Sequence, residues 1–156
     1  MKFIFLAIII GLVVFYFNRS TNNKKAAANN IAIGSEFLAK NKTVNGIIET
    51  SSGLQYQILQ KGEGTIQPRA SAKVKVHYHG YLLDGTVFDS SVERGQPIQF
   101  GLNQVIKGWT EGLQLMAKGD KFKFFIPSYL AYGNRSAGRI MPGSLLIFEV
   151  ELLEIN

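Results

Sequence analysis

Residues 76–91 read VHYHGYLLDGTVFDSS, a pattern typical of a β-hairpin. Val76 and Tyr78 alternate with two histidines, and because successive side chains of a strand point to opposite faces, one face would be apolar and the other polar. The Asp84-Gly85 pair supplies the turn, since glycine accepts the positive φ that a tight hairpin requires. The stretch therefore predicts two antiparallel strands, the first of them half-buried.

Alternating segments also flank this hairpin. Residues 54–58, 121–126 and 145–155 each place apolar side chains on one face and polar side chains on the other. Between residues 105 and 117 the apolar spacing changes to three or four, which predicts a helix with one apolar face formed by Ile106, Trp109, Leu113 and Met116. Residues 51–156 are thus predicted to fold as an α+β domain, an antiparallel β-sheet wrapped around one short amphipathic helix.

The N-terminal run Phe3–Phe17 is apolar throughout and predicts a hydrophobic helix ahead of this domain. It is shorter than the roughly 17–25 residues of a membrane-spanning helix and fills the range of about 7–15 residues found in signal-peptide cores. An uncleaved signal-anchor over residues 1–18 is favoured, because the small residues Ala26–Ala28 lie far beyond the run for a cleavage site. A cleaved signal peptide is the alternative. Either interpretation sends the rest of the chain into or through a membrane.

Residues 19–50 are expected to connect this segment to the folded domain. The stretch from Asn18 to Gly34 is polar and lacks periodicity, which predicts a flexible tether. Ser35–Lys40 is predicted to be a short helix with Ser35 as its N-cap. The expected organisation is therefore a signal-anchor at 1–18, a tether with a short helix at 19–50, and one folded domain at 51–156.

The composition argues against several kinds of chemistry. The chain has no cysteine, and therefore no disulfide, thiolate metal site or thiol nucleophile. His77 and His79 would share a strand face, but the chain holds no third histidine to complete a metal site, so no metal is expected. Neither a Gly-x-Ser-x-Gly elbow nor a phosphate-binding glycine loop is present, and no cofactor is expected.

The charge distribution argues against a nucleic-acid partner. The formal net charge is +6, and much of the excess lies in the N-terminal third, next to the apolar run. A nucleic-acid-binding protein would be expected to carry its basic patch on the folded domain. The basic flank is instead typical of a segment beside a membrane surface.

Four motifs follow one another along the chain: Val76–Ser91, Gln104–Trp109, Phe125–Gly133 and Leu146–Leu153. In this order they resemble the FKBP family of peptidyl-prolyl cis/trans isomerases. Val76–Ser91 is similar to the first family signature, and Gln104–Trp109 to the segment that forms the floor of the family's pocket. Phe125–Gly133 and Leu146–Leu153 complete the set, so the resemblance covers about residues 52–155. Within the family, the chain resembles the bacterial branch related to macrophage infectivity potentiators. An FKBP-like fold and isomerisation of Xaa-Pro bonds are what the resemblance implies.

The resemblance also implies a site. Trp109 would be the floor beneath the prolyl ring, and the Ile106 N–H and the Tyr132 hydroxyl would bind substrate carbonyls. Asp89, held by Tyr78 and Arg94, would stand near the amide that twists. The predicted catalytic residues are Asp89, Tyr132, Phe88 and Trp109, and the predicted substrate-binding residues are Tyr78, Arg94, Phe100, Val105, Ile106 and Phe148.

The sequence departs from the family pattern around this pocket. Ile98 stands where an aromatic side chain is common, and the flap at residues 134–143 carries Ala137 where many relatives have histidine. Arg135 and Arg139 add positive charge to the same flap. These differences affect substrate preference and drug affinity more than the fold or the basic activity.

The expected partners are proline-containing unfolded or partly folded polypeptides, with a macrolide such as rapamycin or tacrolimus as a possible ligand of the pocket. Relatives in this branch often carry a long helical dimerisation arm. The space before Ser35 is judged too short for one, which predicts a monomer. The expected location is the inner membrane with the domain facing the periplasm, or the periplasm itself after signal cleavage. The alternative function is a non-catalytic peptide-binding or chaperone module tethered to the membrane.

Overall fold

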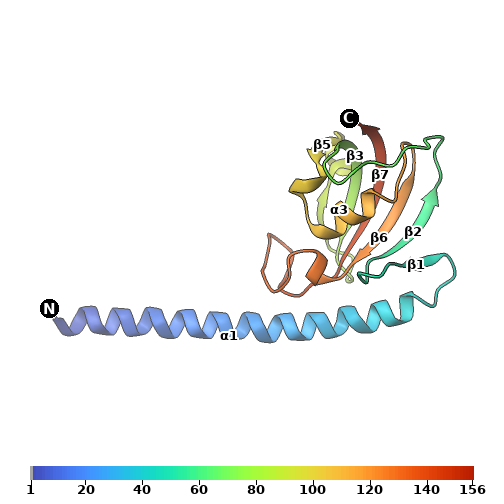
Figure 1. Ribbon diagram of the computed structural model, residues 1–156. Coiled ribbons are helices and arrows are strands. Elements are labelled where there is room, and N and C mark those ends of the chain that lie inside the picture. The colour runs from blue at the N-terminus through green and yellow to red at the C-terminus, as the bar shows by residue number, and fades with distance from the viewer. Residues whose placement is uncertain (1) are drawn as a thin grey trace.

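A long helix and a strongly curved sheet make up the molecule (Figure 1). The computed structural model describes the backbone of residues 2–156 and the side chains from Val14 onward. The elements in chain order are α1 (Lys2–Asn41), β1 (Ile47–Glu49), β2 (Gln55–Gln60), β3 (Lys73–Tyr81), β4 (Val87–Ser90), α2 (Ser91–Arg94), β5 (Ile98–Gly101), η1 (Leu102–Gln104), α3 (Lys107–Leu113), β6 (Lys121–Ile126), η2 (Ser128–Leu130) and β7 (Leu146–Ile155).

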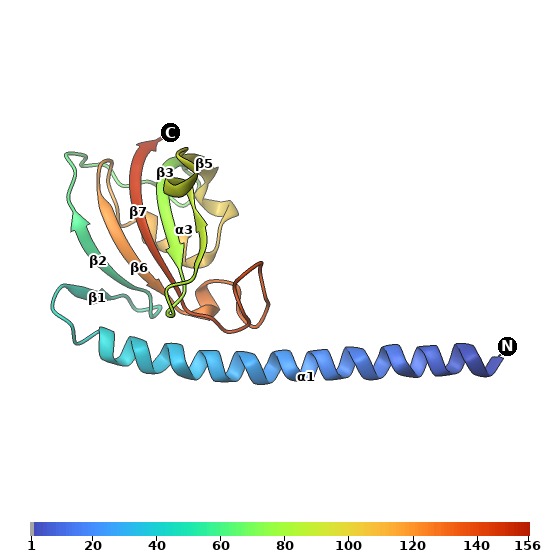
Figure 2. The ribbon, with the colours of Figure 1, turned by 180° about the vertical axis from the view of Figure 1, so that it is seen from behind.

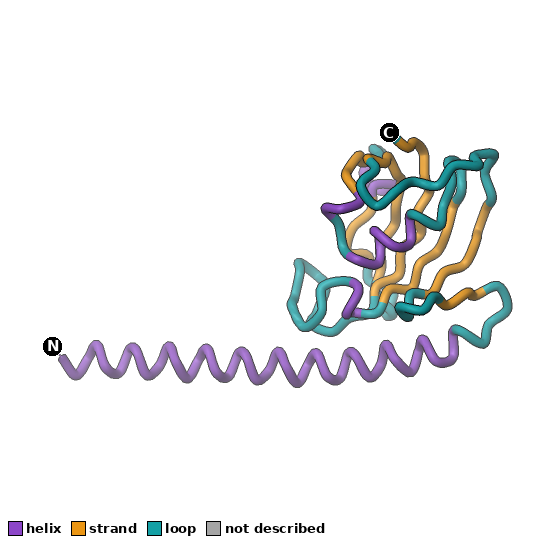
Figure 3. The backbone as a smooth tube through the Cα atoms, in the orientation of Figure 1, coloured by secondary structure: helices purple, strands orange, loops and turns teal. Residues whose placement is uncertain are grey.

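The seven strands form one antiparallel sheet. Six of them follow the order β1-β2-β6-β7-β3-β4, and β5 pairs with the first residues of β3 (Lys73–Val76), on the same edge that further along pairs with β4. The hairpin predicted from residues 76–91 is the β3–β4 pair, with Gly80 opposite Asp89. The sheet curls around α3, which lies against its concave side (Figures 1 and 3). The predicted α+β class, with an antiparallel sheet around a short helix, is confirmed.

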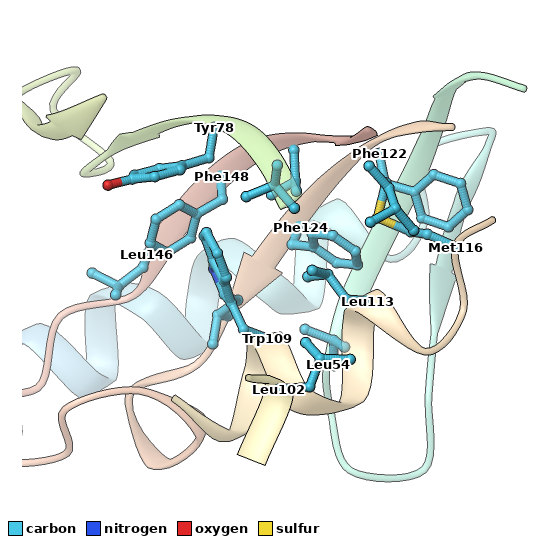
Figure 4. Close-up of a cluster of buried hydrophobic side chains, with 14 of the residues drawn as sticks. Leu54, Tyr78, Leu102, Trp109, Leu113, Met116, Phe122, Phe124, Leu146 and Phe148 are labelled. Carbon is cyan, nitrogen blue, oxygen red and sulfur yellow. The ribbon is translucent and has the colours of Figure 1, made fainter. Parts of the chain in front are cut away.

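The core fills the space between α3 and the sheet (Figure 4). Trp109 and Leu113 point from α3 toward Phe124 of β6 and Phe148 of β7 (Figure 4). A glycine allows the close approach, because a Cβ at Gly112 would lie only 2.6 Å from the Phe124 ring. Burial of these aromatic and aliphatic side chains, at about 25 cal/mol per Å² of apolar surface, is the main source of stability.

The flexible tether predicted for Asn18–Gly34 is wrong, because these residues belong to the uninterrupted helix α1 (Figures 1 and 2). Strong helix formers at Lys24–Ala28 favour this conformation. The C-terminal half of the helix also docks on the domain. Ala27 is 1% exposed, and the Asn30 side chain donates a hydrogen bond to the Pro142 carbonyl at 2.8 Å. One face of α1 is therefore held by tertiary contacts that its polar sequence does not reveal.

The N-terminal half of α1 projects beyond the domain in both views (Figures 1 and 2). Backbone helicity begins at Lys2, and the helix passes without a break through the boundary predicted at residue 18. Much of the predicted signal-anchor lies outside the described residues, since side chains are described only from Val14. Within the described part of the chain, no helix has both the length and the apolar character needed to cross a membrane.

Candidate active site

A cleft of about 720 Å³ opens between α3, the β3–β4 edge of the sheet and the loop that precedes β7. Its floor and walls are mainly apolar. The lining residues are Tyr78, Phe88, Asp89, Ile98, Gln104, Val105, Ile106, Trp109, Ala131, Tyr132, Arg135, Ala137, Gly138, Arg139, Ile140 and Phe148. Concave, apolar sites with a few polar groups are the usual form of small-ligand sites.

An aromatic cluster forms the bottom of the cleft. The Trp109 ring meets Tyr78 edge-on at 5.2 Å between centroids and Phe148 edge-on at 5.1 Å (Figure 4). Phe100 packs against the Trp109 ring with 5.3 Å between centroids, and Phe88 meets Phe148 at 5.2 Å. Edge-to-face pairs at these distances are favourable beyond their buried area. The cluster holds Trp109 in one orientation while leaving a face of the cleft for a ligand.

Trp109 is the third residue of α3, so the start of this helix places the indole at the bottom of the cleft. Ile106 caps the helix, and its carbonyl accepts hydrogen bonds from the N–H groups of Trp109 and Thr110. The Ile106 N–H itself donates to no group in the described part of the chain. It lines the cleft, so this donor is available to a bound carbonyl.

Asp89 lies at the side of the cleft and is held by two donors. The Tyr78 hydroxyl and the Arg94 guanidinium both donate hydrogen bonds to its carboxylate, and Arg94 also donates to the Tyr78 oxygen at 2.9 Å. Arg94 is positioned by the short helix α2, whose N-cap, Ser90, accepts the Glu93 N–H at 3.1 Å. These hydrogen bonds fix the orientation of the Asp89 carboxylate. The remaining lone pairs of its two oxygens stay available to a ligand.

These contacts determine the charge of the group. Burial alone would raise the pKa of Asp89, but hydrogen bonds from Tyr78 and Arg94, together with the Arg94 charge, lower it by more. The pKa of Asp89 therefore lies below its usual value. Burial and the hydrogen bond to Asp89 raise the pKa of Tyr78. The hydrogen bonds that Arg94 donates to Tyr78 and Asp89 raise the pKa of Arg94. At neutral pH the cluster is an ionised aspartate paired with a cationic arginine and a neutral phenol.

Eight of the ten predicted site residues line this cleft: Tyr78, Phe88, Asp89, Val105, Ile106, Trp109, Tyr132 and Phe148. The other two lie just behind it, where Phe100 supports Trp109 and Arg94 holds Asp89. The prediction did not include Gln104, Ala131, Gly138 or Ile140, which also contribute to the lining. Gln104 and Ala131 directly precede predicted site residues, and Gly138 and Ile140 lie within the flap, but nothing in their own pattern indicates the cleft.

His77 and His79 lie on the other side of β3 from the Tyr78 side chain. Their Nδ1 atoms are 2.9 Å from the hydroxyls of Ser91 and Ser90, respectively. Both serines belong to the junction of β4 and α2. The histidines therefore contact the end of β4 and the start of α2 and are not part of the cleft.

The fold and the cleft together define a domain with a concave, mainly apolar site that has a tryptophan at its floor. Comparison with known families identifies it. The model for "FKBP-type peptidyl-prolyl cis-trans isomerase" matches residues 64–153, and the model for "Domain amino terminal to FKBP-type peptidyl-prolyl isomerase" matches residues 13–58. The chain belongs to the FKBP-type peptidyl-prolyl cis-trans isomerase family.

Individual relatives agree with this assignment. The chain is 56% identical over 132 residues to the FKBP-type peptidyl-prolyl cis-trans isomerase FkpA of Aeromonas hydrophila, covering 85% of this chain and 49% of the relative. It is 47% identical over 139 residues to the outer membrane protein MIP of Legionella longbeachae, covering 88% of this chain and 59% of that protein. The chain thus spans about half to three-fifths of the length of these relatives.

A solved structure is also similar. The crystal structure of FkpA from Escherichia coli matches with a TM-score of 0.84 and 41% sequence identity, covering 94% of this chain and 71% of that one. The match therefore includes most of α1 as well as the sheet domain. This agrees with the family model that begins at residue 13, well inside the helix.

Proposed function

We propose that this protein accelerates cis/trans isomerisation of Xaa-Pro bonds in unfolded or partly folded polypeptides, with the prolyl ring seated on Trp109. The observation that carries the proposal is the aromatic floor beside a fixed carboxylate. Trp109 lies in contact with Tyr78 and Phe148 at the bottom of the cleft, and Asp89 stands at its side. The alternative, a peptide-binding or chaperone module without turnover, would use the same cleft.

The chemistry requires rotation of an amide, with no bond made or broken. The barrier is about 18–20 kcal/mol, because rotation destroys the resonance of the planar amide. The twisted amide is less polar than the planar one, so an apolar cleft should bind it more tightly than the ground state, which is transition-state stabilisation by differential binding. In this mechanism the cleft supplies shape and polarity, and proton transfer is not needed.

The polar groups of the cleft would orient the substrate. The Ile106 N–H and the Tyr132 hydroxyl line the cleft and make no hydrogen bond to another described residue, so both are available to substrate carbonyls. Asp89 would face the amide as it twists, while Tyr78 and Arg94 keep the carboxylate ionised and fixed. Pre-organised groups of this kind avoid the cost of reorganisation during the reaction.

Asp89→Ala is expected to lower kcat/KM for short Xaa-Pro peptides at least about tenfold, which corresponds to roughly 1.4 kcal/mol of transition-state stabilisation. The matched control is Asp84→Ala, which removes an exposed aspartate from the β3–β4 turn. Peptide isomerisation would be followed with and without rapamycin, a macrolide of the kind named above as a possible ligand of the cleft. A wild-type protein that binds peptides in the cleft without turning any over would favour the chaperone alternative.

We further propose that α1 is a self-association arm, and that the protein is a dimer. The monomer prediction rested on a lack of space for a long helix, and that premise is wrong because α1 spans Lys2–Asn41. At about 1.5 Å per residue such a helix is roughly 60 Å long. Its projecting part exposes Val14, Phe15, Tyr16 and Phe17 by 51%, 65%, 70% and 63%. Large apolar side chains grouped in this way are typical of a protein contact.

A full-length chain in mild detergent is expected to sediment with the mass of two copies. Val14 and Phe17 lie three residues apart and share a helix face. The double change Val14→Ser/Phe17→Ser should therefore weaken the dimer more than tenfold, since each buried apolar side chain contributes about 1.5–3 kcal/mol. The control is Ile66→Ser, which removes an apolar side chain that is 75% exposed on the sheet domain. A wild-type mass of one chain would contradict the proposal.

The cellular location remains a prediction. One relative is named as an outer membrane protein, which supports placing this chain in the cell envelope. Whether it is held in the inner membrane with the domain facing the periplasm, or released into the periplasm after cleavage, depends on residues 1–18. Most of these lie in the part of the chain whose side chains are not described.

A further inference from the structure

The mouth of the cleft carries an excess of positive charge. Its charged lining residues are Asp89, Arg135 and Arg139. Asp89 is already neutralised by Arg94. Neither flap arginine has a carboxylate within 4 Å among the described residues. The substrate side of the cleft therefore presents two guanidinium groups whose charge the described chain does not balance.

The flap holds Arg139 in a defined place. Ala137 and Ile140 form an isolated antiparallel bridge, with N–H to carbonyl distances of 2.9 and 2.8 Å, so Gly138 and Arg139 form a tight turn between them. Gly138 has a φ of +55°, which glycine adopts without strain. Ile140 is 5% exposed and anchors the turn to the core. Arg139 is thus at the tip of a short hairpin whose base is buried.

The Arg139 guanidinium contacts strand β4. Its Nη1 donates a hydrogen bond to the Val87 carbonyl at 3.1 Å, and Val87 directly precedes Phe88 and Asp89 in β4. One such bond uses one of the five N–H donors of the group and leaves the rest for a ligand. Arg135 lies on the same flap, where its N–H bonds the Tyr132 carbonyl at 3.2 Å. Both arginines line the cleft, and the Arg139 guanidinium contacts the strand that carries Asp89.

We propose that Arg135 and Arg139 make this protein select prolyl segments with a carboxylate side chain within one or two residues of the proline. The proposal rests on the isomerase function proposed above and names its substrate class. A guanidinium pairs with a carboxylate through two parallel hydrogen bonds, which gives geometric selectivity as well as attraction. A neutral or cationic side chain at the same place would leave the arginines unpaired or repelled.

The expected preference is modest because both arginines are exposed. Exposed ion pairs contribute about 0.2–1 kcal/mol, so each arginine should favour the acidic substrate by roughly 1.5- to fivefold. Attraction between exposed charges is screened by salt, with a Debye length of about 10 Å at 0.1 M. The preference should therefore fall as ionic strength rises, while recognition of the prolyl ring by the aromatic floor should change little.

The test uses the full-length chain and peptides that differ only in Glu, Gln or Lys at one position before or after the proline. The expected order of kcat/KM is Glu above Gln above Lys at one or both positions. In Arg135→Gln/Arg139→Gln the ratio of Glu to Gln peptide should approach one. Arg69→Gln, which removes an exposed arginine that does not line the cleft, should leave that ratio as in the wild type. Equal kcat/KM for the three peptides in the wild type would overturn the proposal and leave the isomerase function standing.

A second measurement does not depend on turnover. Trp109 is the single tryptophan of the chain and forms the floor of the cleft, so its fluorescence reports peptide binding there directly. Tighter binding of the Glu peptide than of the Gln peptide, lost in the double arginine variant, would support the selectivity even if no peptide were turned over. Absent turnover would then count against the isomerase function alone, and equal affinities would overturn the selectivity.

Discussion

Replacing Trp109 with alanine is expected to lower kcat/KM by about a hundredfold or more, or roughly 2.7 kcal/mol of transition-state stabilisation. The indole is 5% exposed and contacts Tyr78, Phe100 and Phe148. Its loss removes the surface proposed to support the prolyl ring and opens a cavity at the bottom of the cleft. The same change should reduce the free energy of unfolding by about 3–5 kcal/mol, as for other large aromatic truncations. Peptide isomerisation and urea unfolding would measure the two effects.

A second core variant separates the loss of the site from the loss of stability. Phe124 is 0% exposed, packs against Tyr56, Phe122 and Gly112, and does not line the cleft. Phe124→Ala should cost a similar 3–5 kcal/mol of stability. At a temperature where it remains folded, its kcat/KM should stay near the wild-type value. If Trp109→Ala and Phe124→Ala lost activity to the same extent, the tryptophan floor would have no special role.

The alternation of apolar and polar residues predicted the strands of the sheet well, because a strand that buries one face needs an apolar side chain at every second position. Along β3 the apolar residues Val74, Val76 and Tyr78 are buried, and the polar residues between them are exposed or half-buried. The helix expected between residues 105 and 117 is present as Lys107–Leu113. The helix ends earlier than the apolar spacing indicated. Met116 and Ala117 are buried as expected, but they belong to the turn that follows the helix. Local patterns thus identified which side chains are buried more accurately than where each element ends.

The same reasoning failed for α1 because the docked face of this helix is small and polar. Gly34 lies against Leu145, where a Cβ would come within 3.2 Å of the leucine Cβ, and Ala27 lies against Gly143. Small and polar residues such as Ala27, Asn30 and Gly34 are also typical of a flexible linker, so the sequence alone does not show that they pack against the loop before β7. Ala27, Asn30 and Gly34 are three and four residues apart and so share one helix face. This spacing indicates a docked helix only once the loop that it contacts is known.

The site itself could not be deduced from local pattern either. Asp89 and Arg94 are five residues apart and Tyr78 belongs to the neighbouring strand, so their contact depends on the β3–β4 register and on the cap of α2. The resemblance to a family brought these residues together before the fold was known. The resemblance did not assign the side chains of the flap, where Arg135 and Arg139 depart from the family pattern. The positions of these two arginines follow only from the tertiary structure.

Asp120→Asn is expected to destabilise the domain by about 2–4 kcal/mol at neutral pH, because it removes a buried charged acceptor from several donors. The carboxylate of Asp120 is fully buried between the β2–β3 connection and the loop before β6. It accepts hydrogen bonds from the N–H groups of Gly62 and Ala117 at 2.8 and 2.9 Å, and from the Lys61 ammonium at 2.9 Å. An asparagine keeps the size of the side chain but presents two N–H donors where these groups need an acceptor.

The pH dependence of this effect follows from the pKa of the carboxyl group. Burial alone would raise the pKa of Asp120, but the two backbone N–H groups and Lys61 lower it by more, so the folded-state pKa is below the ordinary value. The stabilisation is therefore fully present above the unfolded-state pKa of about 3.9 and is lost as the pH falls through the folded-state pKa. The difference in stability between the wild type and Asp120→Asn should be constant from neutral pH to about pH 5 and should shrink below pH 4.

The control for this titration is Glu154→Gln, which removes a half-exposed carboxylate that lies 3.7 Å from the Lys75 ammonium. An exposed pair of this kind contributes between 0 and about 1 kcal/mol, so the change should be small at every pH. Lys61→Ala should also cost little, because the lysine side chain is 60% exposed and the backbone donors to Asp120 remain. Urea unfolding at neutral pH and at pH 3.5 distinguishes the cases. A stability difference for Asp120→Asn that stayed the same at both values would show that the buried charge is not what holds the two loops together.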